Sequence, residues 1–330
     1  MSAGPVIVTG AAGFVGLHVA ERLLDRGETV IGVDVFNDYY DPALKAARAA
    51  RLDGRPGFSM VRLDIADAAA FLALVRDSGA KRIVHLAAQA GVRYSIENPF
   101  AYQRSNLAGH LSVLEAARHN GVTHLVYASS SSVYGDRPQS LAGGDSAGFT
   151  ETDAVDAPVS LYAATKRADE LMSISYAKLY AFPMSGLRFF TVYGPWGRPD
   201  MAYYGFTQKI LAGEPIEVYG EGRMARDFTY IDDIVDGVIG VLDNPPPSGG
   251  HEIYNIGDND PVGLMDMITT LEAALGREAV KIMRPMQPGD VTATYADISK
   301  LNALIGYRPK VKLKEGLGRF VDWYRSFYPG

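Results

Sequence analysis

The sequence predicts an α/β fold in which a doubly wound parallel sheet is followed by a smaller lobe. Short runs rich in β-branched residues alternate with amphipathic stretches of helical spacing through the first half of the chain. With 330 residues, 47% of them hydrophobic, the chain can bury a full α/β core. After residue 190 the alternation weakens and Pro, Gly and Tyr become frequent, which is typical of a lobe built from irregular connections.

The individual elements follow from the period of the apolar residues. Parallel strands are expected at Val6–Thr9, Thr29–Val33, Phe58–Leu63, Arg82–Leu86 and Thr123–Ala128. Helices with one apolar face are expected at Phe14–Asp25, Ala68–Asp77, Ala101–His119 and Lys314–Phe327. Residues 136–158 are rich in Gly, Ser, Asp and Pro and predict an exposed loop.

Composition argues against several classes of protein. The net charge is −6, and no basic block is interleaved with aromatic residues, so no nucleic-acid partner is expected. The chain has no cysteine and its six histidines lack the spacing of metal ligands, so we expect neither disulfides nor a metal. The N-terminus lacks the pattern of a signal peptide and no apolar run reaches membrane-spanning length, which predicts a cytoplasmic protein without membrane attachment.

A glycine-rich turn directly follows the first expected strand. Gly10, Gly13 and Gly16 form a Gly-x-x-Gly-x-x-Gly pattern that runs into a helix. Such glycines let the backbone approach a pyrophosphate, while amides at the helix start, here those of Phe14 and Val15, donate to its oxygens. The spacing alone is a weak signal, but a strand before it and a helix after it make it a dinucleotide-binding fingerprint.

An acid at the end of the second strand indicates the kind of dinucleotide. The carboxylate of Asp34 can accept hydrogen bonds from both adenosine ribose hydroxyls and would repel a 2′-phosphate, which favours NAD over NADP. Asn37 is expected to assist it. Asp64 and Ile65 follow the third strand, where a side chain could meet the adenine amino group, although a solvent-exposed acid at a strand end is an equally ordinary explanation.

A tyrosine and a lysine four residues apart form the candidate catalytic pair. In a helix, the spacing of Tyr162 and Lys166 places the phenol and the ammonium on one face. A free phenol, with a pKa of about 10, is a poor base at neutral pH, but a lysine cation and an oxidised nicotinamide both favour phenolate. The pattern occurs by chance in a chain with 19 tyrosines. The run Ser129–Ser132, at the carboxyl edge of the preceding strand, strengthens the assignment because a serine there can relay the proton.

Four longer segments carry a resemblance to a known family. They are Phe36–Asp41, His85–Ser95, Ser129–Gly135 and Arg188–Met201. Through them essentially the whole chain resembles the extended short-chain dehydrogenase/reductases, the NAD-dependent epimerases and dehydratases, and among these the enzymes that epimerise UDP-glucuronate. The resemblance implies a Rossmann-type NAD-binding domain of residues 1–190 plus roughly 226–256, and a UDP-sugar-binding lobe of 191–225 and 257–330.

The resemblance also implies roles for single residues. Tyr162 is the base and acid, Lys166 positions the nicotinamide ribose, and Ser130 is the hydroxyl beside the reacting oxygen of C4. On the cofactor side it adds four residues: Leu86, Ala87, Ala88 and Asn106. On the substrate side Arg226 matches the diphosphate-binding arginine, Tyr219 the residue on uracil, and Asp290 the carboxylate on the uridine ribose.

Two positions favour an acidic sugar. Thr191 stands where the resembling UDP-galactose 4-epimerases carry asparagine, and Arg198 follows in a Gly-Arg-Pro segment. The arginine fork suits a carboxylate, and hydroxyls of Thr191, Ser131 and Ser132 are further donors for it. A solvated loop arginine is the alternative explanation for Arg198, and Arg93 is either a substrate contact or structural.

The implied reaction interconverts UDP-glucuronate and UDP-galacturonate through a 4-keto sugar with tightly bound NAD, which is regenerated in each turnover. Ser132 stands where dehydratases and decarboxylases of the family usually carry an acid, so elimination and decarboxylation are not expected. The alternatives are a 4-epimerase of UDP-glucose or of UDP-N-acetylhexosamines, a UDP-glucuronate decarboxylase and, from another class, an NAD-sensing regulator, which would not need Tyr162 and Lys166. The resemblance further implies a homodimer formed through helices near residues 100–119 and 162–180.

Overall fold

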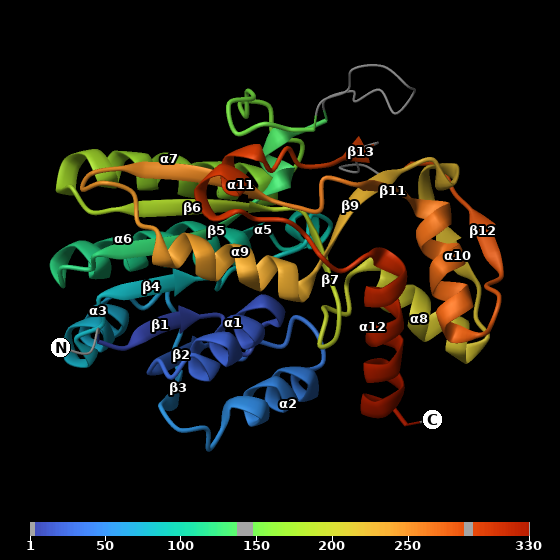
Figure 1. Cartoon of the computed structure of the whole chain (residues 1–330), viewed down its shortest axis with the longest axis horizontal. Helices are drawn as coiled ribbons and strands as arrows, with labels where there is room; N and C mark the ends of the chain where they lie inside the picture. The colour runs from blue at the N-terminus through green and yellow to red at the C-terminus, as the bar shows by residue number, and fades with distance from the viewer. Residues whose placement is uncertain (1–3, 137–147, 287–292, 330) are drawn as a thin grey trace. The chain divides into compact units, whose positions relative to one another are not determined.

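A seven-stranded sheet is the main element of the computed structural model, which describes residues 4–136, 148–286 and 293–329 (Figure 1). The strands lie in the order β10-β6-β5-β4-β1-β2-β3, and β1 pairs in parallel with both β2 and β4. Their bounds are Val6–Thr9 (β1), Val30–Asp34 (β2), Phe58–Arg62 (β3), Arg82–His85 (β4), His124–Ser130 (β5), Met184–Phe189 (β6) and His251–Ile256 (β10). This order is that of a doubly wound sheet, as predicted.

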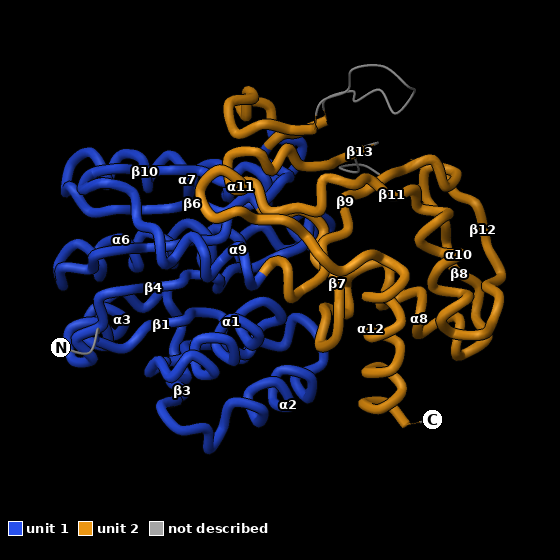
Figure 2. Tube along the Cα trace, viewed as in Figure 1, with its two compact units in different colours: residues 1–133, 158–188, 235–254 blue, residues 134–157, 189–234, 255–330 orange. Residues whose placement is uncertain are grey.

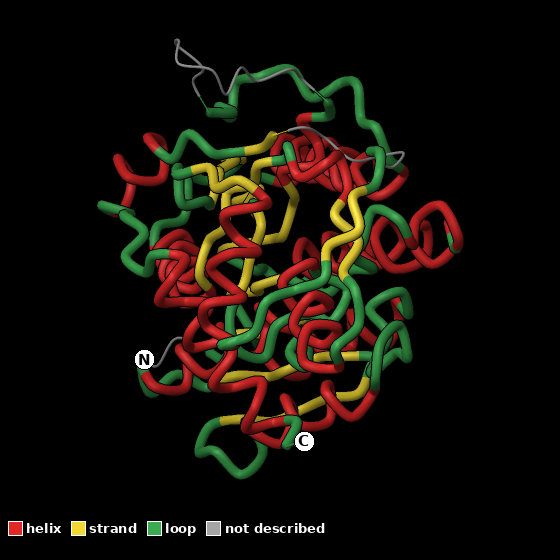
Figure 3. Tube along the Cα trace, turned by 90° about the vertical axis from the view of Figure 1, so that its right-hand side faces the viewer, coloured by secondary structure: helices red, strands yellow, loops and turns green. Residues whose placement is uncertain are grey.

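Helices cover both faces of this sheet (Figure 1, Figure 3). On one side α3, α6 and α7 pack together, and Phe71, Val113 and Ala177 join Ile7 and Ile83 of the strands in one buried core. On the other side α1 and α9 are linked by an ion pair between Arg22 and Asp236. The helix bounds are Phe14–Asp25 (α1), Pro42–Leu52 (α2), Ala68–Ser78 (α3), Tyr94–Glu97 (α4), Pro99–Tyr102 (α5), Gly109–His119 (α6), Leu161–Tyr180 (α7) and Ile231–Asp243 (α9), with a π-helical turn at Gln103–Ala108 (η1) and a 3₁₀ turn at Ser131–Tyr134 (η2).

The chain divides into two compact units (Figure 2). Unit 1 comprises residues 1–133, 158–188 and 235–254, and unit 2 comprises residues 134–157, 189–234 and 255–330. These boundaries place 134–157 and all of 226–234 in unit 2, whereas the sequence-based division assigns them to the first domain. Which unit binds cofactor and which binds substrate stays a prediction.

Unit 2 is built around a small sheet in which β9 pairs with β7, β11 and β13. Asp227 in β9 is fully buried, and its carboxylate accepts backbone hydrogen bonds from Asp258, Asn259 and Ala296. The remaining bounds are Thr191–Tyr193 (β7), Ala202–Ala212 (α8), Ile216–Val218 (β8), Tyr219–Gly222 (η3), Ala225–Tyr230 (β9), Pro261–Gly263 (β11), Leu264–Leu275 (α10), Lys281–Met283 (β12), Ala293–Thr294 (β13), Ser299–Ile305 (α11) and Leu313–Phe327 (α12).

The expected elements in unit 1 are confirmed to within about two residues, with one exception. The predicted single helix Ala101–His119 is wrong, because the chain forms α5, the π-turn η1 and α6 in succession. Asn106 lies inside the π-turn, and its buried amide bonds to groups on other segments. Such π-turns are rare in helices and occur frequently at functional sites.

The described part of the predicted exposed loop at 136–158 is confirmed as a loop, but single residues in its second part are buried. Phe149 is buried, stacks on Tyr134 with ring centroids 4.4 Å apart, and forms a β-bridge with Ala296. Val155 is buried as well. Residues 137–147, which include the predicted tip, lie outside the described residues.

No helix in the described ranges is both long enough and apolar enough to cross a membrane.

Candidate active site

The turn between β1 and α1 can keep its tight backbone only because its glycines lack side chains. Gly10 has a φ of 73°, and a Cβ atom on it would lie 2.9 Å from the amide nitrogen of Ala87. A Cβ atom on Gly16 would lie 2.0 Å from the carbonyl oxygen of Gly10. Gly13 precedes the first helical residue and offers no capping side chain, so the amides of Phe14 and Val15 can serve an anion. These features fit a dinucleotide pyrophosphate.

Asp34 is held in a defined orientation at the carboxyl end of β2. Its carboxylate accepts hydrogen bonds from the backbone amides of Ala12, at 3.1 Å, and Phe36, at 2.8 Å. Asn37 donates to Gln89 Oε1 at 3.4 Å and accepts from the buried ammonium of Lys45. Asp34 and Asn37 therefore come from one short segment and have fixed side chains, as an adenosine ribose site requires.

The next two candidates already have structural partners. Asp64 accepts from the amide of Ala66 and forms an ion pair with Arg104 at 2.8 Å, so its carboxylate has a structural function. Ile65 is buried in the core of unit 1. The role of both in adenine binding stays a prediction.

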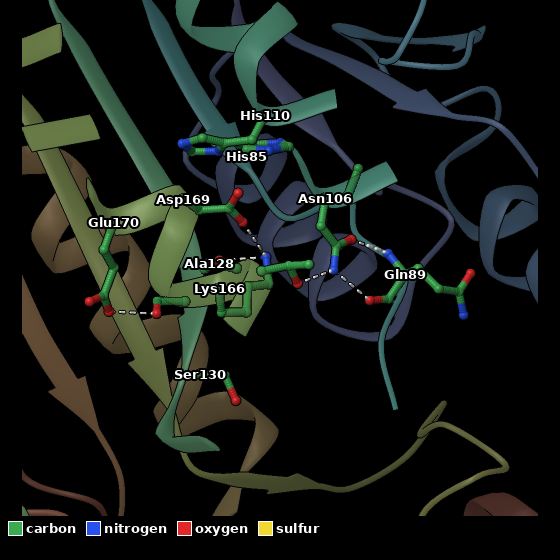
Figure 4. Close-up of polar contacts among 12 residues, drawn as sticks. His85, Gln89, Asn106, His110, Ala128, Ser130, Lys166, Asp169 and Glu170 are labelled. Carbon is green, nitrogen blue, oxygen red and sulfur yellow. Dashed lines mark hydrogen bonds and ion pairs between the residues drawn. The ribbon is translucent and has the colours of Figure 1, made fainter. Parts of the chain in front are cut away.

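Asn106 clamps the segment after β4 to helix α7 (Figure 4). Its amide oxygen accepts from the backbone of Gln89 at 2.8 Å, and its amide nitrogen donates to the carbonyl of Gln89 and to Thr165 Oγ1. Thr9 Oγ1 accepts from the amides of Leu86 and Ala87, at the start of the same segment. The backbone of 86–89, which contains Leu86, Ala87 and Ala88, is thereby fixed at the carboxyl edge of the sheet.

Helix α7 places Tyr162 and Lys166 one turn apart, as the spacing predicts. Ser160 caps the helix by accepting from the amide of Ala163, so Tyr162 lies in the first turn, where the helix dipole favours an anion. The Tyr162 ring is half-buried and meets Tyr102 edge-on. In the part of the chain that the structure describes, its hydroxyl has no hydrogen-bond partner.

Lys166 is buried beneath this tyrosine, with 3% of its surface exposed. Its ammonium donates to the carbonyl oxygen of Ala128 at 2.9 Å and to Asp169 Oδ2 at 3.4 Å (Figure 4). An ammonium has three N–H donors, so one remains for a bound group.

The serine run lies where β5 ends and turns into η2. Ser130 Oγ accepts from both the amide and the hydroxyl of Ser132, at 3.2 and 2.9 Å. Ser131 and Ser132 are half-buried, whereas Ser129 points away and donates to the buried Glu170. Ser130 is thus free to donate its own proton, as a relay needs. Arg93, also in unit 1, is exposed just before α4.

Thr191 and Arg198, two of the candidate carboxylate-binding residues, lie in unit 2. Thr191 begins β7 and is half-buried. Arg198 is half-buried and forms a two-point ion pair with Asp200, with Nε 3.0 Å from Oδ1. The guanidinium of Arg198 is therefore oriented by Asp200, a contact that the sequence interpretation does not include.

The candidate uridine-binding residues also lie in unit 2. Tyr219 donates to Glu217 Oε2 at 2.7 Å, which fixes its ring. Arg226, in β9, donates to the carbonyl of Ala225 and contacts the sulfur of Met224. Asp290 lies outside the described residues.

Three contributors to the site are missed by the sequence interpretation: Thr165, Asp169 and Asp200. The signal for Asp169 is its position three residues after Lys166, the spacing of helical neighbours. Among the described residues no group of three His, Asp or Glu side chains could hold a metal ion.

Comparison with known proteins gives the family. The model of the NAD dependent epimerase/dehydratase family matches residues 6–257. The chain belongs to this family. UDP-glucuronate 4-epimerase 3 of Arabidopsis thaliana is 46% identical over 98% of this chain and 77% of its own length, and protein CapI of Staphylococcus aureus is 44% identical over 98% and 99%. A crystal structure of the UDP-glucuronic acid 4-epimerase from Bacillus cereus, in complex with UDP-glucuronic acid and NAD, superposes with a TM-score of 0.90 at 34% identity and covers 98% of this chain and 100% of that one.

A substitution in the glycine turn tests its expected role in NAD binding. In Gly16→Ala the new methyl group would lie 2.0 Å from the Gly10 carbonyl, so the turn must shift and affinity for NAD should fall at least about tenfold. Isothermal titration calorimetry with NAD measures this. Gly318→Ala is the matched control, because a Cβ atom there meets nothing within 4 Å in helix α12. Unchanged affinity in Gly16→Ala would contradict the proposed role of the turn.

Proposed function

We propose that this protein is a UDP-glucuronate 4-epimerase that interconverts UDP-glucuronate and UDP-galacturonate. One observation carries the proposal: on α7 a tyrosine with an unbonded hydroxyl lies one turn from an ammonium that Ala128 and Asp169 hold in place. Such a pair can remove and return the proton of a secondary alcohol. The full-length similarity to enzymes named for UDP-glucuronate supports the choice of substrate.

Tyr162 is proposed to take the proton of the C4 hydroxyl and later to return it. The positive charge of Lys166 and the N-terminal end of α7 both stabilise the phenolate that accepts this proton. Ser130, whose hydroxyl accepts from Ser132, donates to the oxygen on C4 and so fixes the alcohol. When bound, NAD supplies the oxidant that takes the hydrogen of C4 as hydride and returns it.

The residues proposed for NAD are those of unit 1 described above. Gly10, Gly13, Gly16, Phe14 and Val15 hold the pyrophosphate. Asp34 and Asn37 hold the adenosine ribose. The third N–H of Lys166 is left for the nicotinamide ribose.

The UDP part of the substrate is proposed to stay bound while the contacts of the sugar ring change. Inversion requires the keto sugar to present its other face, so binding energy must come from parts of the substrate that do not react. By their match to the family, Arg226 is proposed for the diphosphate, Tyr219 for uracil and Asp290 for the uridine ribose. The Tyr219–Glu217 hydrogen bond supports a preset ring position.

Arg198 and Thr191 of unit 2 are proposed to bind the C6 carboxylate. The predicted role of Ser131 and Ser132 as further donors stays a prediction. The 4-keto sugar made from glucuronate is a β-keto acid, and an arginine salt bridge disfavours the loss of its charge as neutral carbon dioxide. Ser132 offers no carboxylate for chemistry at C5. These features favour epimerisation over decarboxylation.

A neutral UDP-hexose is the second candidate substrate, and the Arg198–Asp200 ion pair favours it. A carboxylate must share the arginine fork with Asp200 or displace it, whereas a neutral C6 hydroxyl need not. Incubation with UDP-glucuronate, UDP-glucose and UDP-N-acetylglucosamine, followed by chromatography of the products, decides between them. We expect UDP-galacturonate from the first and little product from the others; no change of UDP-glucuronate would overturn the proposal.

Replacing the proposed base tests the chemistry. Tyr162→Phe should lower kcat about 10³-fold, because general acid–base catalysis is lost, while NAD affinity stays within about twofold. Initial rates and calorimetry measure the two effects. Tyr180→Phe, on the exposed end of the same helix, is the control and should keep its rate. Full activity of Tyr162→Phe would exclude it as the principal base.

Replacing Arg198, the proposed carboxylate-binding arginine, tests the specificity for the acidic sugar. Arg198→Ala should lower kcat/KM for UDP-glucuronate about 100-fold, because the carboxylate loses a charged two-point contact, and should spare any activity on UDP-glucose. Arg277→Ala, another arginine of unit 2 with an exposed contact, should change neither. An equal loss with both substrates would remove Arg198 from the carboxylate site.

A homodimer is proposed through the outer faces of α5, α6 and α7. Large apolar side chains are exposed there, with Phe100 79% and Leu179 68% exposed, and Leu111 and Leu171 about half exposed. Several large apolar side chains exposed on neighbouring helices support an interface there. The predicted cytoplasmic location stays a prediction.

Sedimentation tests the dimer. Leu171→Glu should convert the protein to a monomer at micromolar concentration, because a charge would be buried without a partner. Leu304→Glu, an exposed leucine on α11, is the control. A wild-type protein that sediments as a monomer would refute the proposed interface.

A further inference from the structure

A buried carboxylate lies behind the proposed catalytic lysine. Asp169 on α7 is 1% exposed, and its Oδ2 atom is 3.4 Å from the ammonium of Lys166 (Figure 4). Its second oxygen, Oδ1, is buried without a hydrogen-bond partner among the described residues. An unpaired buried carboxylate oxygen costs free energy, which offsets part of the stability that the ion pair with Lys166 contributes.

Among the groups packed around Asp169, Lys166 is the one whose positive charge Asp169 can compensate. Burial lowers the pKa of His85 to about 3 and that of His110 well below the usual range, so both rings are neutral near pH 7. Burial raises the pKa of Tyr127 well above its usual range, so this phenol is neutral as well. The neighbouring acid, Glu170, is itself neutralised by Arg188 and Arg167. The charge that Asp169 can compensate is therefore the one that acts on Tyr162.

We propose that Asp169 is a positioning residue that orients the ammonium of Lys166 and sets the charge which Lys166 presents to Tyr162. The proposal rests on the proposed function of Tyr162 as the base. With two N–H groups held by Ala128 and Asp169, the third has a fixed direction. Without Asp169 the ammonium could rotate about its remaining hydrogen bond.

The positions of three residues on helix α7 determine whether Asp169 favours or opposes formation of the Tyr162 phenolate. Tyr162, Lys166 and Asp169 recur at positions i, i+4 and i+7, so all three lie along one face of α7. A negative Asp169 offsets part of the Lys166 charge, which makes the phenolate harder to form. A neutral Asp169 leaves that charge uncompensated, which makes the phenolate easier to form.

Asp169 changes its protonation state near neutral pH. Burial raises the pKa of Asp169 to about 7, against the opposing effect of Lys166. Asp169 is thus neutral below about pH 7 and charged above it. The compensation of Lys166 therefore strengthens as the pH rises through neutrality.

Direct titration of the tyrosine tests the proposal. The ultraviolet absorbance of phenolate is followed against pH in the NAD-saturated protein, and the signal of Tyr162 is the difference from Tyr162→Phe. In Asp169→Asn the midpoint of this signal should fall by about half a unit to one unit, as expected for one charge about 10 Å away. An unchanged or higher midpoint would overturn the proposal.

A neighbouring acid provides the matched control. Glu170→Gln removes a buried carboxylate from the same helix, but one paired with Arg188, so it should lower the melting temperature and leave the Tyr162 midpoint in place. Asp169→Asn should lower the melting temperature as well, because Lys166 loses its counter-charge, so the Tyr162 midpoint is the measurement that distinguishes the two variants. If Asp169→Asn does not fold, Asp169→Ser replaces it, with the same expected shift. Equal shifts in Glu170→Gln and Asp169→Asn would refute a specific role for Asp169.

The titration needs no sugar nucleotide, so it separates this proposal from the proposed function. If no UDP-sugar is turned over but the midpoint falls, the role of Asp169 stands and the substrate assignment fails. If UDP-glucuronate is turned over and both limbs of the pH–rate profile of Asp169→Asn coincide with those of the wild type, the role of Asp169 fails and the proposed function stands.

Discussion

The burial of one ammonium, that of Lys166, is the constraint on which the proposed site depends. Taking a cation out of water costs several kcal/mol unless hydrogen bonds and a counter-charge replace its hydration. The carbonyl of Ala128 and the carboxylate of Asp169 meet that requirement. Because Ala128 belongs to β5 and Asp169 to α7, the lysine joins the sheet to the helix that bears Tyr162.

The same region is tied a second time through Asn106. Its amide connects the segment after β4 with Thr165, the residue next to Lys166 on α7. The π-turn in the preceding helix makes this possible, since a regular helix would direct the side chain elsewhere. Two polar links, one ionic and one neutral, thus hold the proposed catalytic helix against the carboxyl edges of β4 and β5.

Much of this arrangement could be predicted from the sequence because it is local. The Tyr162–Lys166 spacing, the Gly10 to Gly16 turn and the acid at the end of β2 each depend on a few neighbouring residues. What could not be predicted depends on interactions between distant segments. The apolar period of 101–119 continues through the π-turn, so nothing in it reveals the bonds from Asn106 to Gln89 and Thr165. Likewise the Gly- and Ser-rich composition of 136–158 hides Phe149, which is buried by Tyr134 and Ala296.

The central claim is that Tyr162 moves a proton while the hydrogen on C4 leaves and returns without meeting water. UDP-glucuronate carrying deuterium at C4 tests it most directly, with the product examined by mass spectrometry and NMR after turnover in ordinary water. We expect UDP-galacturonate with the deuterium still on C4, because the same hydrogen is returned to the opposite face. UDP-galacturonate with ordinary hydrogen at C4 would contradict the claim.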